Sequence, residues 1–484
     1  MRLKKFVAIG TALALSLSMV ACSSDKKNND KAEDASTNTP STEVADDTNN
    51  GDDASTDDTL SYANIVLGES YTDLSTTITF YNNRTDMNKD DYDGKTWSEY
   101  VADFNKMYPN IKVKIDADTT YSESALLHLQ SGDYGDVMMI PAVDKKDLSK
   151  YFLSYGDLDT MNNQVRFASD MSYDGQVYGI AYTGTARGIV YNKAVFEKAG
   201  ITTLPKTPEE FIAALQAIKD KTDAIPLYTN YAAGWTMGAW DDYISGTATG
   251  DSTYKNQKLI HASNPFENKK DGTGPYAVYK VLYDAVANGL TEDDYSTTDW
   301  EGCKGMINNG QIGCMVLGSW AYPQMVSAGD HGDDIGYMSF PITVDGKQYA
   351  SIGPDYRIAI NVNSSEDNQK AAMVFVKWLT EKSGLSYDQD GIPISVNDNN
   401  YPEVYKAFDG IELVADDPAL PGEEDYLNEI NADSSLMVSD SGNTKIQEII
   451  EHASNKDMTF DEIMADWNER WTSAQEGNNI EINQ

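Results

Sequence analysis

The fold of this chain is decided by residues 173–211, which read YDGQVYGIAYTGTARGIVYNKAVFEKAGITTLPKTPEEF. The Asp-Gly pair at 174–175 is a turn signal, and the apolar and Gly-rich run after it indicates extended chain. Thr207 and Pro208 then mark a helix start, because Thr is a good N-cap and Pro is favoured at the first helical position. This pattern predicts a chain that leaves one compact lobe and begins a second.

Length and charge narrow the class of protein. A chain of 484 residues is too long for a single hydrophobic core, so we expect two or more lobes. The formal net charge of −40 argues against binding to nucleic acid, whose phosphates it would repel, and against adsorption to anionic lipid. Acidity of this size favours solubility and identifies no partner.

Residues 1–21 form a predicted signal peptide. A basic start precedes an apolar run over residues 6–20, which is too short for an ordinary spanning helix. The run ends at Cys22 in a sequence that resembles a bacterial lipobox, although Met19 stands where Leu is commonest. The resemblance implies lipidation of Cys22 and cleavage before it. The alternative is an ordinary secretory signal with an incidental cysteine.

The next segment is polar, and a folded body follows it. Residues 22–74 have few apolar side chains, so we expect a disordered acidic tether behind the lipidated cysteine. The body begins at the alternating, β-rich run 76–81. A helical pattern at 97–108 and a strand pattern at 111–115 then begin a regular alternation. This order predicts an α/β fold, with lobes built on mostly parallel sheets flanked by helices.

Several blocks resemble one known family. They are similar in order and spacing to the extracellular solute-binding lipoproteins of ABC importers, family 1, which includes maltodextrin- and oligosaccharide-binding members. The blocks are TTITFYNNR at 76–84, FNKMYPNIKVKI at 104–115, HLQSGDYGDVMMI at 128–140 and GMINNGQIGCMVLGSW at 305–320. The stretch 173–211 resembles the crossover segment of that family.

The resemblance implies a two-lobed, periplasmic-binding-protein-like fold with a hinge and a ligand cleft between the lobes. The first lobe would comprise residues 75–183 plus 345–391, and the second residues 184–344 plus 392–484. The implied protein is a monomer on the outer face of a Gram-positive cell membrane. It would capture a carbohydrate without any cofactor and deliver it to the transmembrane subunits of an ABC permease. A peptide or another small polar solute is the alternative ligand.

A sugar site needs flat aromatic faces and planar polar groups that satisfy several hydroxyls at once. Trp320 follows Gly-Ser after a strand pattern, and Trp235 and Trp240 lie in the Gly-broken run YAAGWTMGAWDDY; we expect all three to contact ligand. Trp300 precedes a helix and fits either a core or a ligand contact. Loops that would rim the cleft add the candidates Asn82, Asn83, Arg84, Tyr182, Asp355, Tyr356 and Arg357.

Alternatives stay open for several of these residues. Each loop candidate could instead be a solvated or hinge residue. Two of the six arginines of the chain lie among them, which leaves room for an acidic ligand. Cys303 and Cys314 could form a disulfide or stay as buried thiols. The acidic run 86–93 resembles half of a Ca²⁺ loop, but it lacks the Gly expected at the sixth position, so a solvated loop is favoured over a metal site.

No catalytic motif points to an enzyme. The sequence has no GxSxG elbow, no HExxH and no phosphate-binding Gly-rich loop with a Lys. A pair of carboxylates could still make a surface glycan hydrolase, since the chain has 77 acidic residues, but nothing in the sequence marks such a pair. We therefore expect a receptor without catalytic residues.

Overall fold

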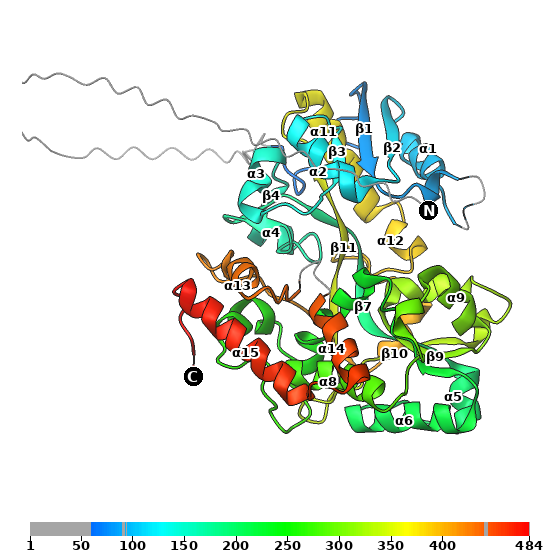
Figure 1. Cartoon of the computed structure of the whole chain (residues 1–484). Helices are drawn as coiled ribbons and strands as arrows, with labels where there is room; N and C mark the ends of the chain where they lie inside the picture. The colour runs from blue at the N-terminus through cyan, green and yellow to red at the C-terminus, as the bar shows by residue number, and fades with distance from the viewer. Residues whose placement is uncertain (1–59, 90–91, 93, 440–443, 484) are drawn as a thin grey trace, which may run out of the picture. The chain divides into compact units, whose positions relative to one another are not determined.

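A computed structural model describes residues 60–89, 92, 94–439 and 444–483. The predicted signal peptide, Cys22 and most of the predicted tether lie outside the described residues. Part of the acidic run 86–93 lies outside them too. The body from residue 60 onward contains two lobes, and strands β7 (Ile180–Asn192) and β11 (Tyr349–Ile360) run through both (Figure 1).

The first lobe is built around a short sheet. Strands β1, β2 and β3 are parallel to one another, and the end of β11 pairs antiparallel with β3. The amphipathic helix α1 buries Trp97, Tyr100 and Phe104 against this sheet, and its N-terminus is closed by a capping box from Thr96. The remaining bounds are β1 Thr76–Asn82, α1 Trp97–Met107, β2 Ile111–Ala117, α2 Tyr121–Ser131, β3 Val137–Met139, α3 Leu148–Tyr151, β4 Gly156–Asp157, α4 Leu158–Asn162, β5 Ser172–Tyr173, β6 Gln176–Val177, α11 Glu366–Glu381 and α12 Leu385–Asp388.

The second lobe places apolar side chains on both faces of its sheet. Strand β9 pairs parallel with β8 and antiparallel with β7, which also pairs antiparallel with β10. Because side chains alternate along β7, Ile189 joins one buried cluster and Val190 the other. The bounds are α5 Lys193–Ala199, α6 Pro208–Lys221, β8 Ile225–Leu227, α7 Gly246–Thr249, α8 Gly274–Ala287, α9 Trp300–Asn308, β9 Ile312–Gly318, α10 Tyr322–Val326, β10 Ile335–Ser339, β12 Glu412–Ala415, α13 Tyr426–Ser434, α14 Thr444–Asn455 and α15 Phe460–Gly477.

Helix starts agree with the sequence patterns that predicted them. Thr207 accepts a hydrogen bond from the Glu210 amide at the start of α6, and Pro208 occupies the first helical position. This confirms that residues 173–211 contain a long crossing strand followed by the first helices of another lobe.

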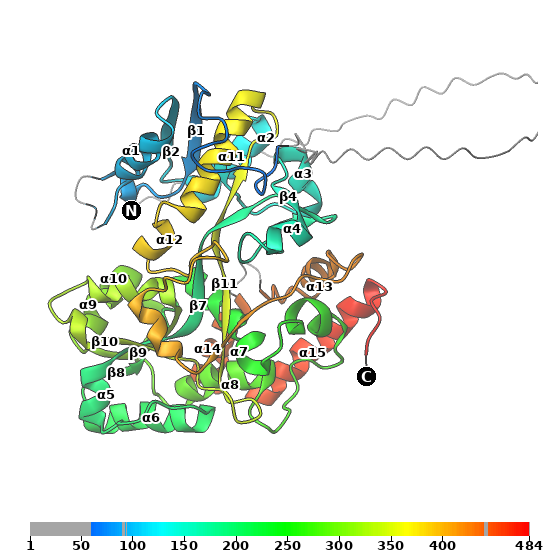
Figure 2. The same cartoon turned by 180° about the vertical axis from the view of Figure 1, so that it is seen from behind.

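The lobes are joined by a ribbon of paired strands. Residues 180–186 of β7 pair with 352–358 of β11, while residues 187–191 pair with β9 in the second lobe. Both figures show the two strands running from one lobe to the other (Figures 1 and 2). The chain around Ile392 lies beside these strands and makes a third connection between the lobes. The backbones of Gly184 and Ile392 exchange hydrogen bonds of 3.1 and 2.7 Å.

The second crossing lies later than the sequence predicted. The boundary was expected between residues 344 and 345. In the structure Ala350 still packs in the second lobe, and residues 349–352 pair with β12. The return to the first lobe therefore lies within β11. The turn signals of this region do not locate the crossing, because Asp345-Gly346 precedes β11 and Gly353-Pro354 lies inside the strand without ending it.

The predicted tether is also too long at its C-terminal end. Tyr62 and Ile65 are buried in the first lobe, at 0% and 4% exposure. The Tyr62 amide donates to the Tyr155 carbonyl at 2.8 Å, and Lys377 donates to the Tyr62 carbonyl at 3.0 Å. The folded body therefore already includes Tyr62 and does not begin at residue 75. Leu60, Leu67, Tyr71 and Leu74 also pack against the same cluster, so several apolar side chains bind this segment to the lobe.

The helices of the described ranges are short or polar. None of them combines the length and the apolar character that crossing a membrane requires.

Candidate ligand-binding site

Three tryptophans from separate segments form one aromatic wall on the second lobe. Trp235 lies in the 3₁₀ segment Gly234–Tyr243, Trp300 begins α9, and Trp320 follows β9. The Trp235 ring lies 5.0 Å from Trp300 at 79° and 5.6 Å from Trp320 at 45°, and Trp300 and Trp320 are 5.8 Å apart. Trp235 is 54% exposed, so this tryptophan wall offers an aromatic ring to solvent.

The wall lies beside a charged group of the connecting ribbon. A Cβ atom on Gly318 would lie 2.6 Å from Trp320 Nε1 and 3.1 Å from Arg187 Nη1, so a larger residue there would clash with the ring and crowd the guanidinium. Arg187 pairs with Asp242 at 2.8 Å and donates to Thr185 Oγ1 at 2.7 Å. Burial raises the pKa of Asp242, although Arg187 acts in the opposite direction.

Trp240 is not part of the wall, and its predicted role as a ligand contact is wrong. It is 2% exposed and packs edge-on against Phe340 at 6.0 Å in the second-lobe core. The Gly-broken run suggested that both of its tryptophans are accessible. The 3₁₀ turn instead directs Trp235 outward and Trp240 inward. Trp300, which the sequence left undecided, completes the wall.

Strand β11 brings three predicted residues to the junction of the lobes. Asp355, Tyr356 and Arg357 follow Gly353-Pro354, and Tyr356 has a φ of 43° and is 38% exposed. Burial raises the pKa of Asp355, and this carboxylate forms no ion pair with the described residues. Arg357 binds Asp170 through both Nε and NH2, at 2.5 and 3.1 Å. Asp355 and Tyr356 are thus the groups of this segment that are left to meet a ligand.

Arg84 is occupied by contacts within the first lobe. It donates to Asp86 at 2.8–3.3 Å, to Gln389 at 2.7 Å, and to the hydroxyls of Tyr182 and Tyr92 at 3.1 and 3.2 Å. These contacts connect the loop after β1 to β7 and to the end of α12. Arg84 therefore holds the connecting segments together, and the structure leaves it no free donor for a ligand.

The other first-lobe candidates differ in whether their polar groups already have partners within the lobe. Asn82 is fully buried, where it donates to the Phe80 carbonyl at 3.2 Å and accepts from the Arg84 amide at 2.9 Å. Tyr182 is 3% exposed, and its ring lies edge-on to Tyr356 at 6.2 Å. By contrast, Asn83 Oδ1 has no hydrogen-bond partner among the described residues. Asn82 and Tyr182 are thus buried within the first lobe, and the Oδ1 of Asn83 is a buried acceptor.

Additional charges line the junction that the sequence did not single out. Lys255 forms an ion pair with Asp416, and both belong to the second lobe. In the first lobe, burial would raise the pKa of Asp170, but Arg357 outweighs it and holds that pKa below its usual value. These residues come from loops far apart in the sequence, so no local motif could have identified them.

The two open questions on cysteine and calcium are partly answered. Cys303 and Cys314 are both free and buried, so the disulfide alternative is wrong. Burial raises the pKa of the Cys303 thiol to about 12, which keeps it protonated. In the described part of the acidic run, Asp86 is engaged by Arg84. Over the described ranges, no three His, Cys, Asp or Glu side chains gather as metal ligands.

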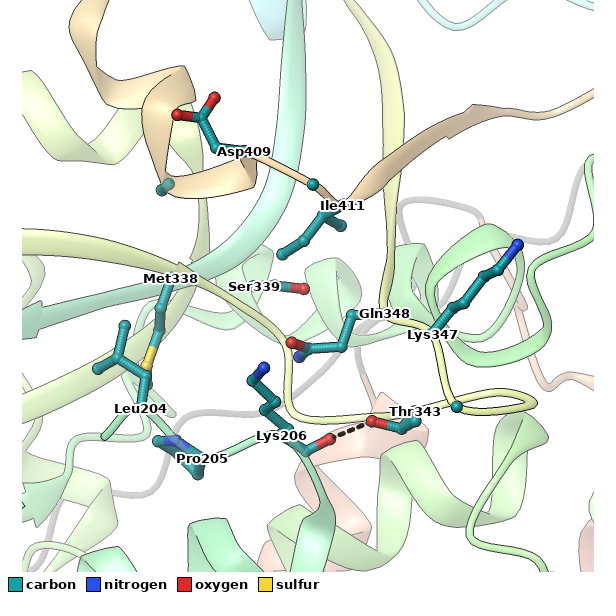
Figure 3. A pocket seen from close by; sticks show the side chains of 13 residues that line it. Leu204, Pro205, Lys206, Met338, Ser339, Thr343, Lys347, Gln348, Asp409 and Ile411 are labelled. Carbon is teal, nitrogen blue, oxygen red and sulfur yellow. Dashed lines mark hydrogen bonds between the residues drawn. The ribbon is translucent and has the colours of Figure 1, made fainter. Parts of the chain in front are cut away.

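Two open pockets lie elsewhere on the second lobe. One has a volume of about 440 Å³, with Lys206, Ser339 and Gln348 among its lining residues (Figure 3). The other, of about 730 Å³, lies between α6 and α8. Neither is lined by a residue of the tryptophan wall or by the predicted ligand contacts.

Two α/β lobes, connecting strands that belong to both, and aromatic and polar groups at their junction define a hinged ligand-binding protein. The sequence places it within that class: residues 88–385 match the bacterial extracellular solute-binding protein family, and the chain belongs to this family.

Solved structures from Bifidobacterium animalis subsp. lactis are similar over nearly the whole body. The manno-oligosaccharide-specific solute-binding protein BlMnBP2, in complex with mannotriose, is 55% identical, with a TM-score of 0.81 over 86% of this chain and 99% of that chain. BlMnBP1, a binding protein of an ABC transporter in complex with mannobiose, is 56% identical, with a TM-score of 0.82 over 87% and 99%.

Curated relatives are more distant. An uncharacterised ABC-transporter extracellular-binding protein of Pyrococcus horikoshii is 24% identical over 295 residues, which are 58% of this chain and 64% of that protein. The chain thus spans less than two thirds of the length of the curated relatives it matches.

Proposed function

We propose that this chain is the substrate-binding receptor of an ABC importer and that its ligand is a short, neutral manno-oligosaccharide. The observation that carries the proposal is the tryptophan wall, whose exposed Trp235 ring suits the apolar face of a pyranose. Asp355 at the junction offers an acceptor for sugar hydroxyls. The mannobiose and mannotriose complexes of the two Bifidobacterium proteins support this ligand class.

The pairing of the arginines favours a neutral ligand over an acidic one. Arg84, Arg187 and Arg357 are each bound to an aspartate at 2.5–2.8 Å. An anionic sugar would have to displace one of these carboxylates, which would leave a charge unpaired in a partly buried place. A neutral sugar can accept and donate hydrogen bonds without breaking any pair.

The mechanism follows from the ribbon that joins the lobes. Ligand that contacts both lobes favours the closed arrangement by its differential affinity for that state. The closed receptor would then present its ligand to the permease, while the receptor itself performs no chemistry. Lipidation at Cys22 would hold this monomer at the outer membrane face, with the acidic segment behind it as a spacer.

Calorimetric titration of the chain from Ser23 onward tests the proposal. We expect binding of mannobiose and mannotriose, and none of mannuronate oligomers, amino acids or peptides. Trp235→Ala should weaken binding about a hundredfold, whereas Trp378→Phe, which changes a tryptophan of the first-lobe core, should not weaken it. Binding only of peptides would overturn the sugar assignment, and release of mannose from the ligands would overturn the absence of catalysis.

A further inference from the structure

The 3₁₀ segment Gly234–Tyr243 faces both the ligand wall and the core. It spans ten residues, although 3₁₀ runs beyond three or four residues are uncommon. Trp235 and Asp242 reach the wall and Arg187, while Asp241 and Tyr243 are buried. Consecutive aspartates therefore point to opposite sides. A segment with such unfavourable regular geometry needs fixed points to hold it.

Asp241 supplies the strongest of these fixed points. Its side chain is fully buried and pairs with Lys445 of α14, which is 2% exposed, at 2.5 Å. The same carboxylate accepts from the Ser439 amide at 2.8 Å and from the Tyr279 hydroxyl of α8 at 2.7 Å. Donors from three separate parts of the second lobe thus converge on one residue. The Tyr243 hydroxyl adds a bond to the Gly188 carbonyl at 2.7 Å.

We propose that Asp241, held by Lys445, is a positioning residue for the tryptophan wall; this inference rests on the proposed function. A buried ion pair is a weak source of stability, because desolvation offsets the attraction between the charges. What this pair fixes is the direction in which the segment Gly234–Tyr243 presents its side chains. With Asp241 held inward, Asp242 points outward and pairs with Arg187, whose Nη1 lies beside Gly318, two residues before Trp320. Loss of the pair should therefore change the affinity for the sugar more than the stability of the fold.

The test removes both charges at once, so that neither is left buried alone. Asp241→Leu with Lys445→Met replaces the pair by apolar side chains, and Asp241→Asn with Lys445→Gln is the milder variant should the first fail to fold. The matched control is Lys377→Met with Glu381→Leu, which removes a largely buried pair at 3.2 Å on α11 of the first lobe. We expect the affinity for mannobiose to fall about tenfold in the Asp241 variant and less than about twofold in the control.

Two further measurements separate positioning from general damage. In a Trp235→Ala background, the Asp241 variant should cost little additional affinity, because the wall it positions is already lost. An equal loss in both backgrounds, or unchanged affinity in a folded variant, overturns the inference. Near-UV circular dichroism of the coupled tryptophans decides the point without ligand. The variant should lose the wall's signal, and an unchanged signal overturns the inference even if wild type binds no saccharide and the proposed function fails.

Discussion

The two lobes meet the ligand position with different chemistry. The second lobe offers a preformed aromatic surface, with Trp235 more than half exposed and supported by two further rings. In the first lobe most polar groups near the junction are already bonded to one another, as the contacts of Arg84 illustrate. The contrast shows that abundance of polar residues near a site says little about recognition. What matters is which groups keep an unsatisfied face.

The largest expected effect is loss of the exposed ring. Trp235→Ala should weaken saccharide binding about a hundredfold, about 2.7 kcal/mol, because exposed aromatic anchors dominate such sites. Titration calorimetry would measure it, with Trp378→Phe as the control. An affinity within threefold of wild type would show that the second lobe does not carry recognition.

Arg84→Met should act on stability and spare recognition. Its removal leaves Asp86 without its cation and breaks hydrogen bonds to three other residues, so we expect a loss of about 2 kcal/mol in the free energy of unfolding. Thermal unfolding would show a Tm lower by several degrees. If the folded variant instead lost most of its affinity at an unchanged Tm, Arg84 would be a ligand contact, as the sequence suggested.

Asp355→Asn should raise stability and weaken ligand binding, which is the reverse of the pattern expected for Arg84→Met. Burial raises the pKa of this carboxyl, so its ionised form costs stability once the pH rises above the unfolded value near 4. Removing the charge should stabilise the ligand-free protein by about 1 kcal/mol at pH 7 and weaken sugar binding. Denaturant titration with and without mannobiose measures both. A less stable variant with unchanged affinity would contradict the proposed role.

The smallest expected effect is a pH dependence from Asp170. Its folded pKa is lowered below the ordinary value, so its contribution to stability is present above about pH 4 and is lost as the pH falls through the folded pKa. Between pH 5 and pH 3, wild type should lose more stability than a double variant with Asp170→Asn and Arg357→Met. If urea titrations showed that both proteins lose the same stability over this pH range, the Asp170–Arg357 pair would not contribute to the pH dependence.

The sequence predicted more of the fold than of the site. Turn and cap signals are local, so residues 173–211 alone predicted the passage between lobes and the start of α6. The Gly-broken run around Trp235 and the Gly-Ser pair before Trp320 pointed to two of the three tryptophans that form the wall. The contacts that occupy Arg84 could not be predicted, because its partner Gln389 lies 305 positions away. Burial of Trp240 and Tyr62 depends on surfaces supplied by distant segments, which no local pattern describes.

The paired strands β7 and β11 have a mechanical consequence. A hydrogen-bonded ribbon resists stretching and sliding, since either would break several bonds at once, whereas twisting keeps each bond in place. The strands are paired from Ile352 opposite Ala186 to Ile358 opposite Ile180, so we expect the lobes to move relative to each other mainly by twisting of this ribbon. Its stiffness, set by backbone and not by side chains, would then fix how much binding energy closure consumes.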